Sequence, residues 1–170
     1  GYILVALLGE SGQAQSSIFY FLLIYLFSNL AAFGVVGIVS ENTGKENIDD
    51  YKGFYKTNKF LSWVLAIGLF SLAGVPPTAG FFGKLFLILS GASTCNYVLI
   101  ILASLNLIVS FYYYLRVIRA IFMDNHIEPI EKTNPGLFPT IALGVCILGI
   151  VILGLYGPAY EFIVQIVHPY

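Results

Sequence analysis

Charged side chains are scarce in this chain. Lys, Arg, Asp and Glu together make up 10% of its 170 residues, whereas a soluble domain carries about 25%. Hydrophobic residues make up 58%, and the mean hydropathy is +0.87. The formal net charge is −1 and there is no basic stripe, which excludes nucleic acid as a partner. The composition therefore predicts an all-α, polytopic transmembrane helix bundle whose surroundings are the lipid bilayer.

Patterns that bind metals or cofactors are also missing. The two cysteines, Cys95 and Cys146, lie far apart with no ligand cluster, so we interpret them as reduced thiols. His126 lies in a polar loop and His168 near the end of the chain, and we interpret both as solvated. There is no phosphate loop, no dinucleotide fingerprint and no cysteine cluster for iron–sulfur. We expect no metal site, no cofactor site and no redox centre in this chain.

Long apolar runs, by contrast, are abundant. A bilayer core of about 30 Å is crossed by about 20 apolar residues in a helix. The pattern predicts one transmembrane domain, 1-170, with a partial helix 1-9, a helix 17-40, a broken helix 60-75/78-91, a helix 97-122, and a helix 137-156 with an interfacial tail 158-170. Because the chain starts at Gly1 inside an apolar run, we expect a fragment that lacks its N-terminal part.

The run from Phe60 to Leu89 is too long for one straight crossing, because as a helix it would measure about 45 Å. Two adjacent prolines near its middle remove two backbone donors and free the carbonyls near Leu72 and Ala73. Irregular backbone at membrane depth is tolerated where it is buried in protein or lines a hydrated cavity. We therefore predict a discontinuous helix of the kind that transporters use at their ion sites. The residues of the predicted break are Gly74, Pro76, Pro77 and Gly80.

Lys84 is the one basic residue that the pattern places deep inside a span. An ammonium at the bilayer centre costs roughly 3 kcal/mol on insertion scales, so water, a partner charge or a proton path must offset it. The alternative is a lysine near a helix end whose ammonium extends to the interface. Lys84 lies six residues from Ser90 and seven from Pro77, farther from the interface than such lysines usually lie. We interpret it as a proton relay.

Other polar side chains in the spans have two interpretations. They either form hydrogen bonds between helices or line a wire of water molecules. Ser28 and Asn29, in the helix 17-40, belong to this group. The candidates for a proton path in the helix 97-122 are Ser104, Asn106 and Ser110.

Basic residues gather on one side of the predicted topology. Alternating spans put seven of the eight on the same side, which the positive-inside rule makes cytoplasmic. These seven are Lys45, Lys52, Lys56, Lys59, Arg116, Arg119 and Lys132. The tyrosine run 112–114 beside them is typical of an aromatic belt at the interface.

A long signature, SLAGVPPTAGFFGK, runs from Ser71 to Lys84. It resembles a signature of the antiporter-like subunits of respiratory complex I, the NADH:quinone oxidoreductase, and most closely that of the bacterial subunit N. The sister subunit M usually has a glutamate where Lys84 stands. Further similar segments follow in the family's order and spacing, at 1–7, 25–34, 50–54 and 112–117.

The resemblance implies the C-terminal portion of an antiporter-like fold and a role as a translocase subunit in the bacterial inner (plasma) membrane. Protons would move through a half-channel centred on Lys84, coupled to electron transfer elsewhere. NADH, FMN, iron–sulfur clusters and quinone would bind other subunits, and the partners would be the other membrane subunits of complex I. Two alternatives stay open. One is a subunit of a multi-subunit sodium/proton antiporter or membrane-bound hydrogenase, and the other is a non-transporting membrane scaffold subunit.

Overall fold

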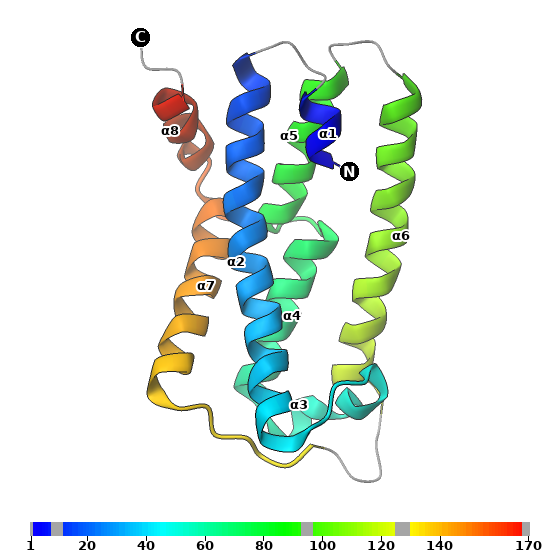
Figure 1. Ribbon diagram of the computed structural model, residues 1–170, viewed down its shortest axis with the longest axis vertical. Coiled ribbons are helices and arrows are strands. Elements are labelled where there is room, and N and C mark those ends of the chain that lie inside the picture. The colour runs from blue at the N-terminus through cyan, green and yellow to red at the C-terminus, as the bar shows by residue number, and fades with distance from the viewer. Residues whose placement is uncertain (1, 8–11, 93–96, 125–129, 168–170) are drawn as a thin grey trace.

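The computed structural model describes residues 2–7, 12–92, 97–124 and 130–167, and within these residues all regular structure is helical. In chain order the elements are α1 (Tyr2–Leu7), α2 (Gly12–Thr43), η1 (Ile48–Tyr51), α3 (Phe54–Thr57), α4 (Lys59–Ala73), α5 (Ala79–Ala92), α6 (Tyr97–Phe122), α7 (Leu137–Leu155) and α8 (Pro158–Val167). Figure 1 shows α2, α6 and α7 running along the long axis, with α4 and α5 end to end beside α2. The predicted all-α bundle with one discontinuous helix is confirmed.

Among the residues that the structure describes, three helical stretches are long and apolar enough to cross a bilayer. They cover Ala14–Thr43, Val98–Phe122 and Leu137–Leu155. α4 and α5 are each shorter, at 15 and 14 residues, which correspond to about 22 Å and about 21 Å of helix. Because they follow one another along the bundle axis (Figure 1), together they make a fourth crossing.

The core is built around α2, which packs against α4, α5 and α7. Small residues bring the backbones of α2 and α4 close together. A Cβ built on Gly68 would lie 3.2 Å from the Ser28 carbonyl oxygen and 3.3 Å from the Ala32 nitrogen. Such close approach stabilises helix pairs in lipid, where the hydrophobic effect between helices is absent. This contact determines how α4 is rotated about its axis, and so which side of its C-terminal end faces α2.

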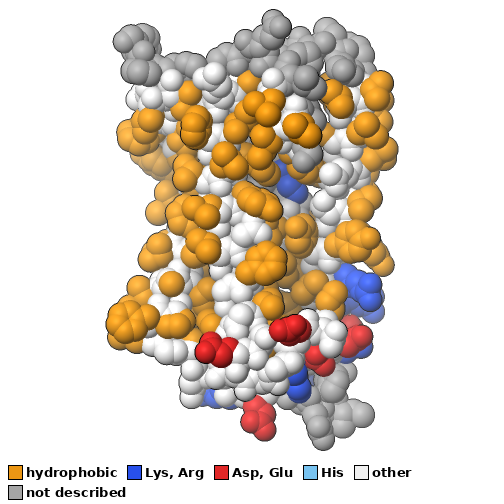
Figure 2. Space-filling view, in the orientation of Figure 1, with side chains coloured by type: hydrophobic (Ala, Val, Ile, Leu, Met, Phe, Trp, Pro, Cys, Tyr) orange, Lys and Arg blue, Asp and Glu red, His pale blue; other side chains and the backbone are white. Residues whose placement is uncertain are grey.

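At one end of the bundle, η1 and α3 pack against the end of α6. The Gly53 N–H donates to the Ala120 carbonyl at 3.1 Å. Asn58, which is 5% exposed, donates to the Glu131 carbonyl at 3.0 Å and accepts from the Thr133 N–H at 2.8 Å. These bonds bring the two polar loops to the same end, as the distribution of basic residues predicts. Figure 2 shows most Lys, Arg, Asp and Glu side chains gathered there, with hydrophobic side chains over much of the remaining visible face.

Two helix boundaries differ from the sequence pattern. α2 begins at Gly12 and ends at Thr43, so its polar flanks at both ends are helical as well. The tail forms α8, which begins with Pro158, a residue that suits the first turn of a helix. The Tyr160 ring of α8 lies 4.4 Å from that of Phe86 and 5.5 Å from that of Tyr20, between ring centroids. The tail therefore packs on α2 and α5.

Cys146 lies in α7 and is buried. Cys95, His126 and His168 lie outside the described residues. Among the residues that the structure describes, no group of three or more His, Cys, Asp or Glu side chains comes close enough to hold a metal ion.

Candidate functional site

The C-terminal end of α4 lies inside the bundle, where it meets the start of α5 (Figure 1). Gly74 ends the helix in the left-handed conformation, with φ at 81°. Its N–H donates to the carbonyls of Phe70 and Ser71, which closes the last turn. The link to α5 is stabilised by Thr78, whose hydroxyl donates to the Val75 carbonyl at 2.7 Å.

Two carbonyls at this helix end have no helical partner. In a continuous helix the carbonyls of Leu72 and Ala73 would accept from the residues four positions later, which are Pro76 and Pro77. Proline has no N–H, so both oxygens are free to accept another donor. Lys84 supplies it, because its Nζ donates to the Leu72 oxygen at 2.7 Å and to the Ala73 oxygen at 3.1 Å.

The position of Lys84 in α5 explains how its ammonium reaches the carbonyls of Leu72 and Ala73. Side chains in a helix are tilted toward its N-terminus, and the N-terminus of α5 faces the break. Lys84 is 6% exposed and its Nζ lies 5.3 Å from the centroid of the Tyr2 ring. Within the described part of the chain no carboxylate forms an ion pair with it. The ammonium is therefore held by carbonyl oxygens at the negative end of the α4 dipole and by an aromatic face.

Two of the predicted break residues are glycines for steric reasons. A Cβ at Gly80 would overlap the carbonyl oxygen of Ser71, so only glycine lets α5 approach the end of α4 this closely. A Cβ at Gly74 would lie 3.2 Å from Cδ of Lys84, in addition to the strain of a positive φ. Gly74 therefore leaves room for the Lys84 side chain, and Gly80 lets α5 pack against the last turn of α4.

A cavity of about 110 Å³ lies beside the Lys84 side chain. A water molecule needs about 10–15 Å³ of such volume and two or more polar partners, so the cavity has room for several water molecules. Ser28 donates to Ser71 at 2.7 Å between the two hydroxyl oxygens, which joins α2 to α4 at the cavity wall. The residues with hydroxyl groups that line it are Tyr2, Tyr25, Ser28, Ser71, Ser110 and Tyr114.

The three polar candidates of α6 are placed differently from one another. Ser110 lines the cavity with Lys84. Ser104 is exposed and its hydroxyl donates to the Ile100 carbonyl of its own helix. Asn106 is exposed too, and it accepts from the Ser110 hydroxyl at 3.4 Å. Of the three, the structure thus brings Ser110 to the lysine.

Sequence reasoning did not select Ser71 or Tyr2 as site residues. Ser71 stands in the signature run, but its burial depends on the packing of α4 against α2. Tyr2 is far away in sequence and is brought to Lys84 by α1, which packs against α5 and α6. No local pattern could have indicated either contact.

Comparison with known proteins decides the family. The sequence model of a protein family, described as NADH:quinone oxidoreductase/Mrp antiporter, transmembrane, matches residues 1–110 of this chain. The chain belongs to this family. The family and the apolar helices together place the chain in a bacterial inner membrane as a multi-pass protein, as predicted.

The similar curated proteins agree with the predicted resemblance to subunit N. NADH-quinone oxidoreductase subunit N of Phocaeicola vulgatus is 38% identical over 164 residues, which is 96% of this chain and 35% of that protein. Subunit N of Geotalea uraniireducens is 37% identical, over 92% of this chain and 33% of that protein. The chain thus spans about a third of the length of these relatives.

A solved structure shares the fold. A chain of respiratory complex I from Thermus thermophilus superimposes with a TM-score of 0.79 over 94% of this chain and 36% of that chain. The sequence identity in this pair is 23%, so the comparison speaks for the fold alone.

Proposed function

We propose that the chain is part of a proton-translocating membrane subunit of an NADH:quinone oxidoreductase, and that Lys84 is a proton relay within it. One observation carries the proposal. A buried ammonium with two backbone carbonyls as its acceptors lies beside a cavity whose lining includes six residues with hydroxyl groups. Family membership supports the larger assignment.

The chemistry needs a group that alternates between a protonated and a neutral form. The carbonyls of Leu72 and Ala73 orient Nζ in both forms, since a neutral amine still donates hydrogen bonds. The hydroxyls of Ser28 and Ser71 can each donate and accept, so together with water they can pass a proton to or from Nζ. Burial keeps bulk water out and makes this transfer dependent on the cavity.

In the proposed assembly, this chain supplies only the proton path around Lys84. NADH, FMN, iron–sulfur clusters and quinone bind other subunits, where electron transfer occurs. The other membrane subunits of the complex are its partners, and they complete the path beyond the cavity.

The test is Lys84→Ala in the whole assembled complex, reconstituted in vesicles. Assembly should be retained, since the change removes no large part of the core, while proton flux and the coupled NADH oxidation should fall. Lys84→Arg should restore little, because a guanidinium stays charged, and Lys84→Glu should restore some transfer. Lys59→Ala is the matched control, because Lys59 is exposed at the start of α4. Wild-type flux in a normally assembled Lys84→Ala complex would refute the relay.

A subunit of a multi-subunit sodium/proton antiporter is the second candidate, because the family description names the Mrp antiporter alongside the oxidoreductase. The subunits that co-purify with the full-length protein distinguish the two. An NADH-oxidising module supports the first proposal, and a set of antiporter subunits alone supports the second. A scaffold role would instead predict that a neutral residue at position 84 leaves ion flux unchanged.

A further inference from the structure

A groove of about 930 Å³ lies between α4 and α6 and ends at η1. None of its lining residues lines the Lys84 cavity. The wall residues that belong to α4 and α6 are largely apolar. The chief ones are Trp63, Phe70, Ile108, Phe111, Leu115 and Phe122. Trp63 and Ile108 are 52% and 65% exposed. The wall of the groove is therefore a partly exposed apolar surface along the apolar helical stretch Val98–Phe122.

The length of the groove can be estimated from its helical wall. From Ile108 to Arg119, α6 rises about 16 Å. On the α4 side, Phe70 lies one turn before Gly74, where the helix breaks. The groove thus extends from the charged end of the bundle to the level of the break, which is long enough to take much of an acyl chain.

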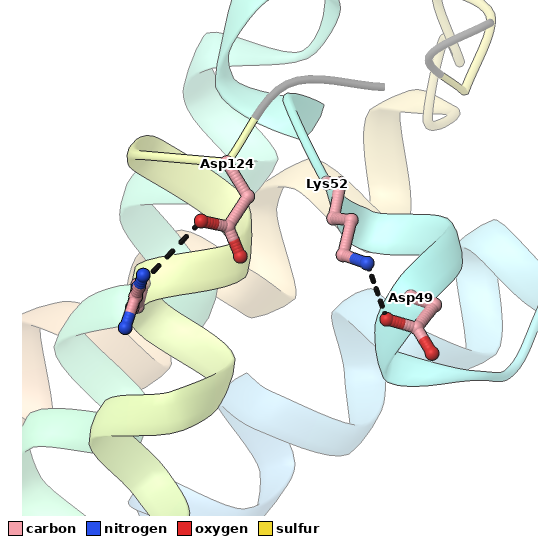
Figure 3. A network of polar contacts seen from close by, with 4 residues as sticks. Asp49, Lys52 and Asp124 are labelled. Carbon is pink, nitrogen blue, oxygen red and sulfur yellow. Dashed lines mark ion pairs between the residues drawn. The ribbon is translucent and has the colours of Figure 1, made fainter. Parts of the chain in front are cut away.

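The mouth of the groove is basic. Lys52 forms an ion pair with Asp49 at 2.6 Å, and Arg119 forms one with Asp124 at 3.5 Å (Figure 3). All four residues line the groove, together with Arg116. Arg116 has no ion pair among the described residues, so the mouth carries one positive charge in excess. Arg116 and Arg119 are three residues apart on α6, so their side chains lie on one face.

Basic pockets between transmembrane helices are typical sites for acidic lipid headgroups. We propose that this groove binds one anionic phospholipid, with its phosphate between Arg116 and Arg119 and an acyl chain along Trp63. Guanidinium groups bind phosphate through paired hydrogen bonds. The apolar wall then covers the chain at membrane depth. The proposal does not depend on proton transfer at Lys84.

Two other occupants fit the groove less well. A free phosphate would use the arginines and leave the apolar wall uncovered. A helix of a neighbouring subunit would cover the wall, but it would need an acidic side chain at the mouth to match the excess charge. A phospholipid supplies in one molecule both the phosphate that matches the excess charge and the acyl chain that covers the apolar wall.

The first experiment measures lipid retention in the purified complex with native mass spectrometry, after washing in detergent and titration with phosphatidylglycerol or phosphatidylcholine. Arg116→Gln and Arg119→Gln should each weaken retention of phosphatidylglycerol, roughly tenfold for the loss of one charge-assisted contact. Phosphatidylcholine should be retained less than phosphatidylglycerol by the wild type. Lys132→Gln is the matched control, because it removes an exposed positive charge at the same end without lining the groove.

Equal loss in the Lys132→Gln control would mean that general surface charge holds the lipid, and it would overturn the site. Equal retention of the two lipids by the wild type would overturn the role of the arginines. A covalent cross-link from a neighbouring subunit to a cysteine in place of Ile108 would show a protein occupant and overturn the proposal as well.

The second experiment tests the acyl chain. Trp63 is the only tryptophan of this chain, and it lines the groove, so phosphatidylglycerol with brominated chains should quench its fluorescence. The fluorescence of Trp63 is obtained by subtracting the emission of the Trp63→Phe complex from that of the wild-type complex. Quenching should saturate at the lipid concentration that saturates retention. Arg116→Gln should raise the lipid concentration needed for quenching and for retention by the same factor. Absence of quenching while the lipid is retained would place the lipid elsewhere and refute the groove.

Discussion

The Lys84 ammonium has two backbone acceptors because Pro76 and Pro77 have no N–H to donate to the carbonyls of Leu72 and Ala73. At the residue scale, each missing N–H leaves one carbonyl free for a contact across the break. A single added methyl group also matters here, because a Cβ at Gly80 would overlap the Ser71 carbonyl oxygen in the last turn of α4, next to these acceptors.

Gly80→Ala should prevent stable assembly. Its Cβ would overlap the Ser71 carbonyl oxygen, which is backbone and cannot move without shifting α4. We expect a loss of about 3 kcal/mol or more, the upper part of the range for overpacking. The measurement is the amount and thermal stability of the assembled complex. Gly144→Ala, where a Cβ would meet nothing within 4 Å, should be neutral. Equal stability of the two variants would contradict this account.

Tyr51 gives a prediction on pH dependence, and it lies in η1, outside the spans. Its hydroxyl is buried, with no hydrogen-bond partner among the described residues. Burial, followed by the charges of Asp50 and Glu46, raises the pKa of Tyr51 from 10.0 to about 12. Because the pKa is higher in the folded state, the stability due to the neutral phenol is present below pH 10 and is lost as the pH rises through 12.

Tyr51→Phe should therefore lose less stability than the wild type between pH 10 and 12. Below that interval it should be at least as stable, since a buried hydroxyl without a partner costs about 1–3 kcal/mol. Thermal unfolding midpoints across this interval are the measurement. Tyr113→Phe, at an exposed position, serves as the control. Parallel profiles for wild type and Tyr51→Phe would show that this phenol does not contribute.

Among the elements, the α4–α5 pair carries the site, and α6 and α2 close it. The break places the negative end of α4 and the positive end of α5 in the interior, where charges are scarce. Lys84 comes from α5 and its two acceptor carbonyls come from α4. Any change that makes α4 and α5 one continuous helix should therefore separate Lys84 from these carbonyls.

A double variant, Pro76→Ala with Pro77→Ala, tests this at the level of the element. It restores two N–H donors that can bond to the carbonyls of Leu72 and Ala73. These donors compete with Lys84, so proton flux should fall toward that of Lys84→Ala while the complex still assembles. Pro139→Ala is the control, because Pro139 lies in the first turn of α7, where no N–H is needed. Unchanged flux in the double variant would mean that the two carbonyls are dispensable.

For the whole molecule, the two polar loops share one end through the hydrogen bonds of Asn58. From the basic residues of these loops, the positive-inside rule predicts that this end is cytoplasmic. The flanks between the ends, and the groove beside α6, leave large hydrophobic side chains exposed.

Cysteine labelling with a membrane-impermeant reagent tests this orientation in the full-length protein. Cysteines at the exposed positions of Asn47 and Lys132 should react from the cytoplasmic side. A cysteine in place of Glu161, in α8, should react from the other side, because α8 packs on the opposite half of α2. Reaction of the first two from different sides would refute the topology.

The sequence by itself determined the features that depend on neighbouring residues. Hydropathy determined the spans, the charges determined which loops share an end, and the missing N–H groups of Pro76 and Pro77 determined the break and its free carbonyls. The tertiary structure decided which side chains meet Lys84. Ser110 lines its cavity while Ser104 and Asn106 lie exposed, because the rotation of α6 is set by packing and not by its own sequence. The contacts of Ser71 and Tyr2 likewise arise between distant segments, where spacing along the chain carries no information about distance in space.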